Sequence, residues 1–230
     1  MLEKINSGIP GLDKIMGGGI PKNHIVLISG TCGTGKTTMC MQYMYEGVTK
    51  YGENGVFLSF EESPESMKST YKEFGWDFDF LEKKGKFKFI KYDPYHIEEI
   101  FDILSSAVVE VGAKRVAIDS LSALALHLHD REDIRKMIFD LAALLSKLNC
   151  TAFVVSEIVP GKKGISRYGV EEFMSDSVIV LYYERNKLVF SRGIQIWKVR
   201  GSNHSKNVHP YKISAKGITI NPEEEAYFKD

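Results

Sequence analysis

The glycine-rich segment GTCGTGKTT, residues 30–38, constrains the fold of this chain more than any other feature. It matches the pattern G-x-x-x-x-G-K-[ST], follows an apolar run at 24–29 and opens a segment of helical period at 36–50. Its glycines allow the backbone torsions that aim successive N–H groups into one concavity, and a helix N-terminus adds partial positive charge. The segment therefore predicts a strand–loop–helix unit that binds the phosphates of a nucleotide.

The side chains of this loop suit a magnesium nucleotide. Lys36 is expected to reach the β- and γ-phosphates, and the Thr37 hydroxyl is expected to ligate Mg²⁺. Cys32 is either a redox-sensitive thiol, because thiols at helix N-termini ionise more readily, or a small residue at a variable position. ATP and Mg²⁺ are the predicted cofactors, and the residues expected to contact the nucleotide are Gly30, Thr31, Cys32, Gly33, Thr34, Gly35, Lys36, Thr37 and Thr38.

Apolar runs and helical segments alternate through residue 184. Runs rich in β-branched and aromatic residues predict strands buried on both faces, at 24–29, 55–60, 86–92, 115–120, 151–156 and 177–183. Helices are expected between them, at 36–50, 64–74, 96–111 and 131–149. This alternation predicts an α/β fold with a mainly parallel sheet flanked by helices. Beyond residue 184, a hairpin at 187–199 turning near Arg192–Gly193 and strands near 210–214 and 217–220 extend the sheet.

The composition limits the classes of function. Thirty basic and thirty acidic side chains balance, so the chain has no general field that would collect DNA or acidic lipid. The apolar runs are too short to cross a bilayer, and no charged-then-apolar leader opens the chain. The three cysteines show no paired spacing and are expected to be reduced thiols in a cytoplasmic protein. The length fits a single domain, residues 1–230.

Carboxylates follow two of the predicted strands. Asp119 ends the run RVAID and is expected to hold the magnesium hydration shell, because ligands of parallel sheets bind at the carboxyl ends of the strands. Glu61 and Glu62 follow the run at 55–60, and if the strand continues regularly they cannot both face one spot. One of them is expected to face the γ-phosphate and polarise the attacking water, while the other either orients that water or caps the helix that starts at Pro64. Glu62 is the preferred base, with Glu61 as the alternative. Glu157, at the same predicted edge, is a weaker candidate for sensing the γ-phosphate.

The segment from Arg185 to Pro222 holds eight lysines and arginines, two histidines and no acid. Lys198 and Arg200 stand two apart on a predicted strand, so they project from one face and suit a polyphosphate. DNA is the rival partner, because the loop at 160–169 carries Lys162, Lys163 and Arg167. That loop is short and lightly charged, so DNA is possible but not favoured.

Several longer motifs resemble those of KaiC-like ATPases of the RecA superfamily. They are SGIPGLDKIMGGGIPKN at 7–23, the glycine-rich loop, FEES at 60–63, SRYGVEEFMSDSVIVL at 166–181 and KVRGSNHSKNVHPY at 198–211. The resemblance covers essentially the whole chain. It implies a RecA-like core, residues 24–184, preceded by an ordered loop near the subunit seam, residues 1–23, and followed by a β extension, residues 185–230. It also implies an ATPase that assembles as a ring, usually a hexamer, with ATP at each seam.

The resemblance assigns roles to particular residues. It implies that Glu61 and Glu62 are the catalytic acids and that Lys198 and Arg200 reach the γ-phosphate held by the neighbouring subunit. Ser202 and His204 fall at positions that also line the neighbour's nucleotide. The acid-free segment then has the neighbour's ATP as its negative partner. Three functions stay open: a regulatory ring ATPase, a DNA-dependent recombinase-like ATPase, and an assembly module that binds ATP without hydrolysing it.

Two departures from the cyanobacterial clock protein narrow these expectations. That protein carries two such domains in one chain, whereas this sequence has one. Its second half phosphorylates an adjacent Ser–Thr pair, and Glu172–Phe173 stand at the equivalent place here. The resemblance therefore extends to ATP hydrolysis, and it does not extend to autokinase activity or clock function.

Overall fold

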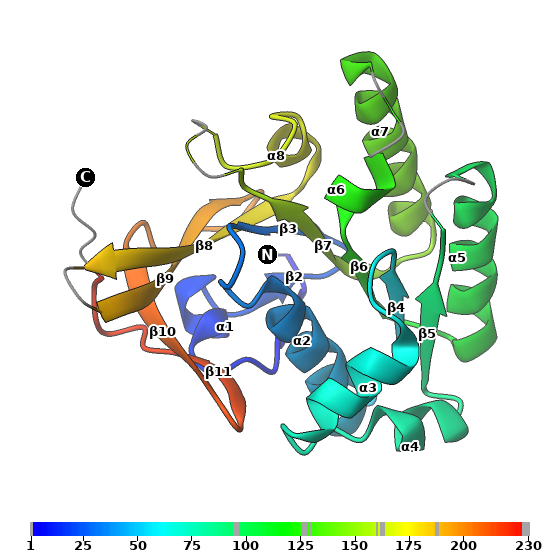
Figure 1. The fold of residues 1–230 in the computed structure, drawn as a ribbon, viewed down its shortest axis with the longest axis horizontal. Coiled ribbons are helices and arrows are strands. Elements are labelled where there is room, and N and C mark those ends of the chain that lie inside the picture. The colour runs from blue at the N-terminus through cyan, green and yellow to red at the C-terminus, as the bar shows by residue number, and fades with distance from the viewer. Residues whose placement is uncertain are drawn as a thin grey trace.

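A nine-stranded sheet organises the chain, with strand order β11-β10-β9-β8-β3-β7-β6-β4-β5 (Figure 1). The computed structural model describes residues 2–93, 97–125, 128, 130–159, 161, 164–186 and 189–226. The six strands from β8 to β5 run parallel, and they are β3 (Ile25–Gly30), β4 (Gly55–Ser59), β5 (Phe87–Lys91), β6 (Arg115–Asp119), β7 (Thr151–Glu157) and β8 (Ser177–Asn186). The antiparallel extension comprises β9 (Val189–Val199), β10 (Val208–Ser214) and β11 (Gly217–Ile220). The predicted α/β fold with a mainly parallel sheet is confirmed.

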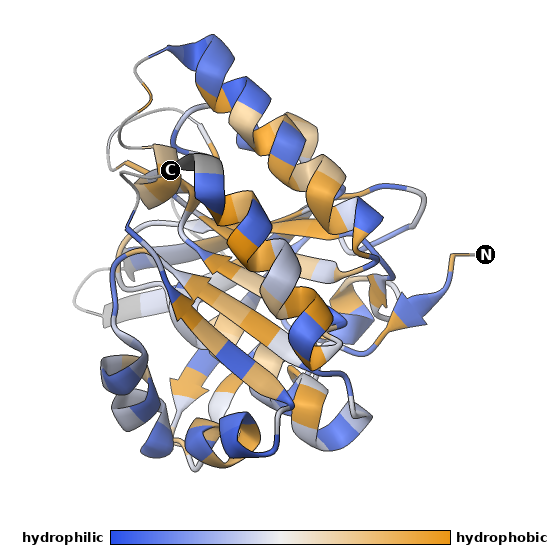
Figure 2. Cartoon of the chain, turned by 90° about the vertical axis from the view of Figure 1, so that its right-hand side faces the viewer, coloured by the Kyte–Doolittle hydropathy of each residue, from blue (hydrophilic) through white to orange (hydrophobic). Residues whose placement is uncertain are grey.

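Helices cover both faces of the sheet and define two hydrophobic cores. One core lies against α1 (Leu12–Ile15), α2 (Lys36–Tyr51), α3 (Pro64–Lys72) and α4 (Phe78–Lys83). The opposite core lies against α5 (Ile97–Val111), α6 (Leu121–Leu124) and α7 (Arg131–Lys147), with α8 (Glu171–Met174) at its border. Figure 2 shows apolar residues concentrated on the strands, and apolar residues interspersed with polar ones along the helices. Burial on both faces explains why the parallel strands are continuous apolar runs.

The helices begin where the sequence supplies capping groups. Ser63 accepts a hydrogen bond from the Ser66 amide, and Pro64 occupies the first turn of α3, as predicted. Asp130 caps α7 in the same way through the Glu132 amide. Helix α2 differs, because Gly35 stands at its N-cap and no side chain or acidic residue covers its first turn. The N–H groups at the start of α2 are therefore left for a ligand.

The predicted turn at Arg192–Gly193 is wrong. Strand β9 continues through both residues, which pair with Tyr183 and Tyr182 of β8, and the strands approach their connection at Asn186 and Val189. Gly193 is a turn-forming residue by type, but here it lies buried in the middle of a long antiparallel pair. Long cross-strand pairing, which the local sequence does not reveal, outweighs the turn propensity of an Arg–Gly pair.

The N-terminal segment packs into the body of the protein. Strands β1 (Lys4–Ile5) and β2 (Ile20–Pro21) pair, and Leu12 and Met16 are fully buried. Arg115, fully buried at the start of β6, donates to the carbonyls of Asn6, Ser7 and Tyr43 and to Glu53. A buried guanidinium needs such partners, so this network ties the N-terminal segment to the core. Across the ranges described above, every helix is too short or too polar to span a bilayer.

Candidate nucleotide site

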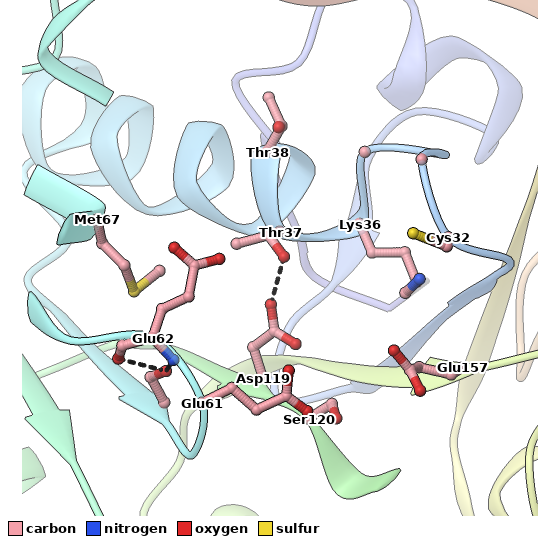
Figure 3. Close-up of a pocket in the computed structure, with 13 residues that line it drawn as sticks. Cys32, Lys36, Thr37, Thr38, Glu61, Glu62, Met67, Asp119, Ser120 and Glu157 are labelled. Carbon is pink, nitrogen blue, oxygen red and sulfur yellow. Dashed lines mark hydrogen bonds between the residues drawn. The ribbon is translucent and has the colours of Figure 1, made fainter. Parts of the chain in front are cut away.

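A pocket of about 290 Å³ opens at the carboxyl ends of β3, β4, β6 and β7 (Figure 3). Three segments that were predicted to form a nucleotide site meet there. They are the glycine-rich loop, the pair of glutamates and the end of the strand that carries Asp119. The lining residues are Cys32, Gly33, Gly35, Lys36, Thr37, Thr38, Ser59, Glu61, Glu62, Met67, Asp119, Ser120 and Glu157. Ser59, Met67 and Ser120 were not predicted, since nothing in the local sequence separates them from ordinary core residues. Gly30, Thr31 and Thr34 are not among the lining residues, and Thr34 Oγ1 instead donates to the carbonyl of Thr31 within the loop.

The glycine-rich loop needs its glycines for backbone shape and for space. Gly35 has φ +87°, and a Cβ atom there would lie 2.5 Å from Cδ1 of Ile213. At Gly30, a Cβ atom would lie 2.7 Å from the carbonyl oxygen of Leu181. A side chain at Gly30 would collide with backbone, and one at Gly35 would be strained by the positive φ, so these two glycines allow the path by which the loop enters α2.

Lys36 and Thr37 point into the pocket from the first turn of α2, as Figure 3 shows. The Lys36 ammonium donates to the carbonyl of Thr31 at 3.0 Å, and Thr34 Oγ1 donates to the same carbonyl at 2.8 Å. The ammonium group therefore lies over the loop, beside the N–H groups at the start of the helix. Together they form one positively charged cradle for an anion.

Asp119 faces Thr37 across the pocket floor. Thr37 Oγ1 donates to Asp119 Oδ2 at 2.6 Å, and the peptide bond between Asp119 and Ser120 is cis. Burial raises the pKa of Asp119 to about 6, while the Thr37 hydrogen bond and the Lys36 charge oppose that rise. Hydroxyl and carboxylate oxygens are the ligands that Mg²⁺ prefers, so this pair fits the metal of a magnesium nucleotide. The described residues hold no cluster of three or more His, Cys, Asp or Glu side chains that would form a metal site without a nucleotide.

Glu61 and Glu62, the two candidate catalytic acids, both line the pocket. Strand β4 ends at Ser59, whose hydroxyl donates to the Glu62 carbonyl and accepts from the Glu62 amide. This turn ends the strand alternation before the glutamates are reached. Figure 3 shows the two side chains diverging, with Glu62 towards the start of α2 and Glu61 towards Ser120.

Glu157 lies at the end of β7 on the far side of the pocket from the two glutamates (Figure 3). Its carboxylate lies 3.5 Å from the Arg167 guanidinium. Arg167 is thus paired within the chain. Lys162 and Lys163, the other cations of the candidate DNA loop, lie outside the described residues.

The β extension holds the glycine-rich loop from outside. The Tyr211 hydroxyl donates to the carbonyl of Thr34, and the Arg192 guanidinium donates to the carbonyl of Gly33 at 3.2 Å. Arg192 also stacks on the Tyr183 ring, with 4.3 Å between its central carbon and the ring centroid. These contacts join residues about 160 to 180 positions apart, so they could not be predicted from the local sequence.

Lys198 and Arg200 lie outside this pocket. The Lys198 ammonium donates to the carbonyl of Glu172 at 2.8 Å, and Arg200 donates to the carbonyl of Phe173 at 2.9 Å. Burial lowers the pKa of Lys198, and the neighbouring Arg200 charge lowers it further. Both cations thus turn towards α8, in keeping with the expectation that they share a face.

Ser202 and His204 line a second cleft, which shares no residue with the first. Lys4 enters that cleft from β1, and its ammonium donates to Ser202 Oγ at 2.7 Å and to the carbonyl of Gly17 at 2.6 Å. Within one chain, the sequence-predicted nucleotide residues therefore fall into two groups. One surrounds the glycine-rich loop, and the other lies along the end of β9 and the loop that follows it.

Comparison with known proteins decides the family. The model of the KaiC ATPase family matches residues 5–225 of this chain. The chain belongs to the KaiC ATPase family. A UPF0273 protein of Methanocaldococcus jannaschii is 35% identical, with 96% of this chain and 98% of the relative covered. The circadian clock protein KaiC3 of Synechocystis is 38% identical over 96% of this chain, which corresponds to 46% of that longer protein.

A solved structure supports the same assignment. The KaiC-like protein of Pyrococcus horikoshii superposes with a TM-score of 0.89 and 36% identity, covering 96% of this chain and all of that one. The chain therefore has the fold and the nucleotide-binding character of a P-loop ATPase of the RecA superfamily. Like the UPF0273 relative, it matches a single KaiC domain over nearly its full length.

Proposed function

We propose that this KaiC-family protein hydrolyses Mg-ATP in a ring, usually a hexamer, whose nucleotide sites are completed by the neighbouring subunit. Its role would be regulatory, through assembly that depends on bound nucleotide. The three free cysteines favour a cytoplasmic location, because thiols stay reduced there. The observation that carries the proposal is the charge of the pocket. Lys36 is the only lysine or arginine among its described lining residues, which also include four carboxylates of the same chain: Glu61, Glu62, Asp119 and Glu157. A triphosphate in such a pocket needs further positive charge.

Lys198 and Arg200 are suited to supply that charge from a neighbouring chain. Both lie on the β extension, and the Arg200 side chain is 55% exposed. A guanidinium placed in trans stabilises the charge that develops on the transferring phosphoryl group, and its planar fork is better suited to this than an ammonium. Ser202 and His204 would approach the same nucleotide from the second cleft, together with this cationic pair.

Within the chain, the glycine-rich loop would bind the triphosphate. The backbone N–H groups from Gly33 to Thr38 and the Lys36 ammonium would neutralise its oxygens, while Thr37 and Asp119 would hold Mg²⁺. The metal, when bound, neutralises charge on the β- and γ-phosphate oxygens. Glu62 is proposed as the base that accepts a proton from the attacking water, with Glu61 as the alternative, because both carboxylates line the pocket.

Phosphate release under saturating Mg-ATP tests hydrolysis, and mixed chains test the trans arrangement. Arg200→Ala chains keep an intact pocket, and Lys36→Ala chains keep an intact Lys198–Arg200 pair. Each variant alone should be nearly inactive, and mixing them should restore activity at hybrid seams. Failure to recover activity in mixtures that assemble would exclude action in trans.

Two other functions are separated by the same assay. A DNA-dependent ATPase of the RecA type would be strongly stimulated by single-stranded DNA. Arg167 of the candidate DNA loop is already paired with Glu157, which favours the regulatory function. A module that only binds ATP would show nucleotide affinity and assembly without phosphate release.

A further inference from the structure

We propose that Asp176 is a positioning residue that aims Arg200 at the triphosphate of the neighbouring subunit. This inference rests on the proposed function, in which Arg200 acts in trans. Arg200 Nη1 lies 3.3 Å from Asp176 Oδ1, and the Arg200 amide donates to the Asp176 carbonyl at 2.9 Å. The arginine is thus held by the same residue through its backbone and through its side chain.

Asp176 is itself anchored where three strands meet. Its amide donates to the carbonyl of Ile25 at 2.9 Å, and its second carboxylate oxygen accepts from the Ile25 amide at 3.1 Å. Ile25 begins β3, Ser177 begins β8 next to Asp176, and Val199 ends β9. Asp176 therefore ties the position of Arg200 to the first residue of β3, the middle strand of the nine-stranded sheet, whose other end leads into the glycine-rich loop.

A second acceptor fixes the rotation of the guanidinium. Arg200 Nη2 donates to the carbonyl of Phe173 at 2.9 Å, whereas the contact with Asp176 is made by Nη1. Two acceptors on different atoms hold the planar group in one orientation, whereas an exposed arginine with no partner samples many rotamers. Lys198 is held alongside by the carbonyl of Glu172, so both cations rest on α8.

The held guanidinium can still bind an anion. Of its five N–H donors, two serve Asp176 and Phe173, which leaves three for phosphate oxygens. The Arg200 side chain is 55% exposed and the Asp176 side chain 27%, so the aspartate lies behind the arginine and the arginine faces outward. A cation ordered before assembly loses less conformational freedom when it meets its ligand, which favours turnover.

The test uses chains that can contribute only the cationic pair. Arg200→Ala chains at fixed concentration provide pockets, and increasing amounts of a Lys36→Ala donor provide the Lys198–Arg200 pair. A donor carrying Lys36→Ala with Asp176→Asn should restore roughly tenfold less activity at saturating donor. Asparagine keeps an oxygen for the Ile25 amide, so the sheet junction is preserved. A donor with Lys36→Ala and Glu110→Gln, which removes a surface ion pair with Lys88, should restore as much as Lys36→Ala alone.

The plateau and the midpoint of the donor titration report different things. A misoriented Arg200 lowers the ATPase activity reached at saturating donor. Weakened assembly changes only the donor concentration that gives half-maximal activity. Equal plateaus for the Lys36→Ala donor and its Asp176→Asn derivative would overturn the positioning role alone. If the Lys36→Ala donor restores nothing, action in trans fails, and the positioning role fails with it.

Discussion

Replacement of Asp119 by asparagine should stabilise the metal-free protein while weakening its response to magnesium. The Asp119 carboxylate lines the pocket and is largely shielded from solvent, and this burial raises its pKa from 3.8 to about 6. That rise corresponds to about 3 kcal/mol of free energy that ionised Asp119 costs the folded state. Asparagine is neutral, has the same shape, and can still accept the hydrogen bond from Thr37.

The sign of the effect follows from proton binding. Because the folded-state pKa lies above the unfolded value, the folded protein binds the proton more tightly, and its stability falls as pH rises from about 4 to about 6. Asp119→Asn removes that dependence, so its advantage should be near its maximum above pH 7, and roughly half as large at pH 5. For a chain of this size, 1 to 3 kcal/mol corresponds to an increase in Tm of about 3 to 10 °C.

Thermal unfolding with EDTA at pH 8 and pH 5 measures this prediction. Addition of Mg-ATP should then stabilise the wild-type chain more than Asp119→Asn, because the variant lacks the anionic oxygen that is proposed to hold the metal. If the variant is no more stable than the wild type at pH 8 without metal, burial of ionised Asp119 does not destabilise the folded protein, and this explanation is refuted.

Three further substitutions test the proposed roles of Lys36, Glu61 and Glu62, and an assay with DNA tests the rival function. Lys36→Ala should abolish tight ATP binding. Unchanged ATP affinity in a calorimetric titration would show that the Lys36 ammonium does not bind the phosphates. Glu62→Gln should leave ATP affinity intact and slow phosphate release by roughly a hundredfold or more. If Glu61→Gln is the more damaging of the two, the assignment of the base is reversed. Single-stranded DNA should leave the ATPase rate nearly unchanged, and strong stimulation would favour the recombinase-like function.

Features that depend on a local pattern were predictable from the sequence. The glycine-rich loop carries its own glycines, lysine and threonine in fixed spacing, and the buried parallel strands are continuous apolar runs. The cap of α3 was also visible, because Ser63 and Pro64 are adjacent. In each case the physical cause lies within a few residues of its effect.

Features that depend on distant contacts were not predictable. The turn expected at Arg192–Gly193 is overruled by pairing with β8, and the buried guanidinium of Arg115 has partners on the N-terminal segment and α2. Helix α8 has four residues, too few to show a helical period, yet its carbonyls hold Lys198 and Arg200. The turn that Ser59 closes with Glu62 ends β4 before the two glutamates, and the local sequence does not reveal that turn.

The dependence of turnover on protein concentration tests the central claim most directly. Phosphate release per chain, measured at saturating Mg-ATP while the protein is diluted and its mass is followed by light scattering, should fall as assemblies separate into single chains. The fall is expected because Lys198 and Arg200 lie outside the pocket of their own chain. A rate per chain that stays constant down to the monomer would contradict a site completed by its neighbour.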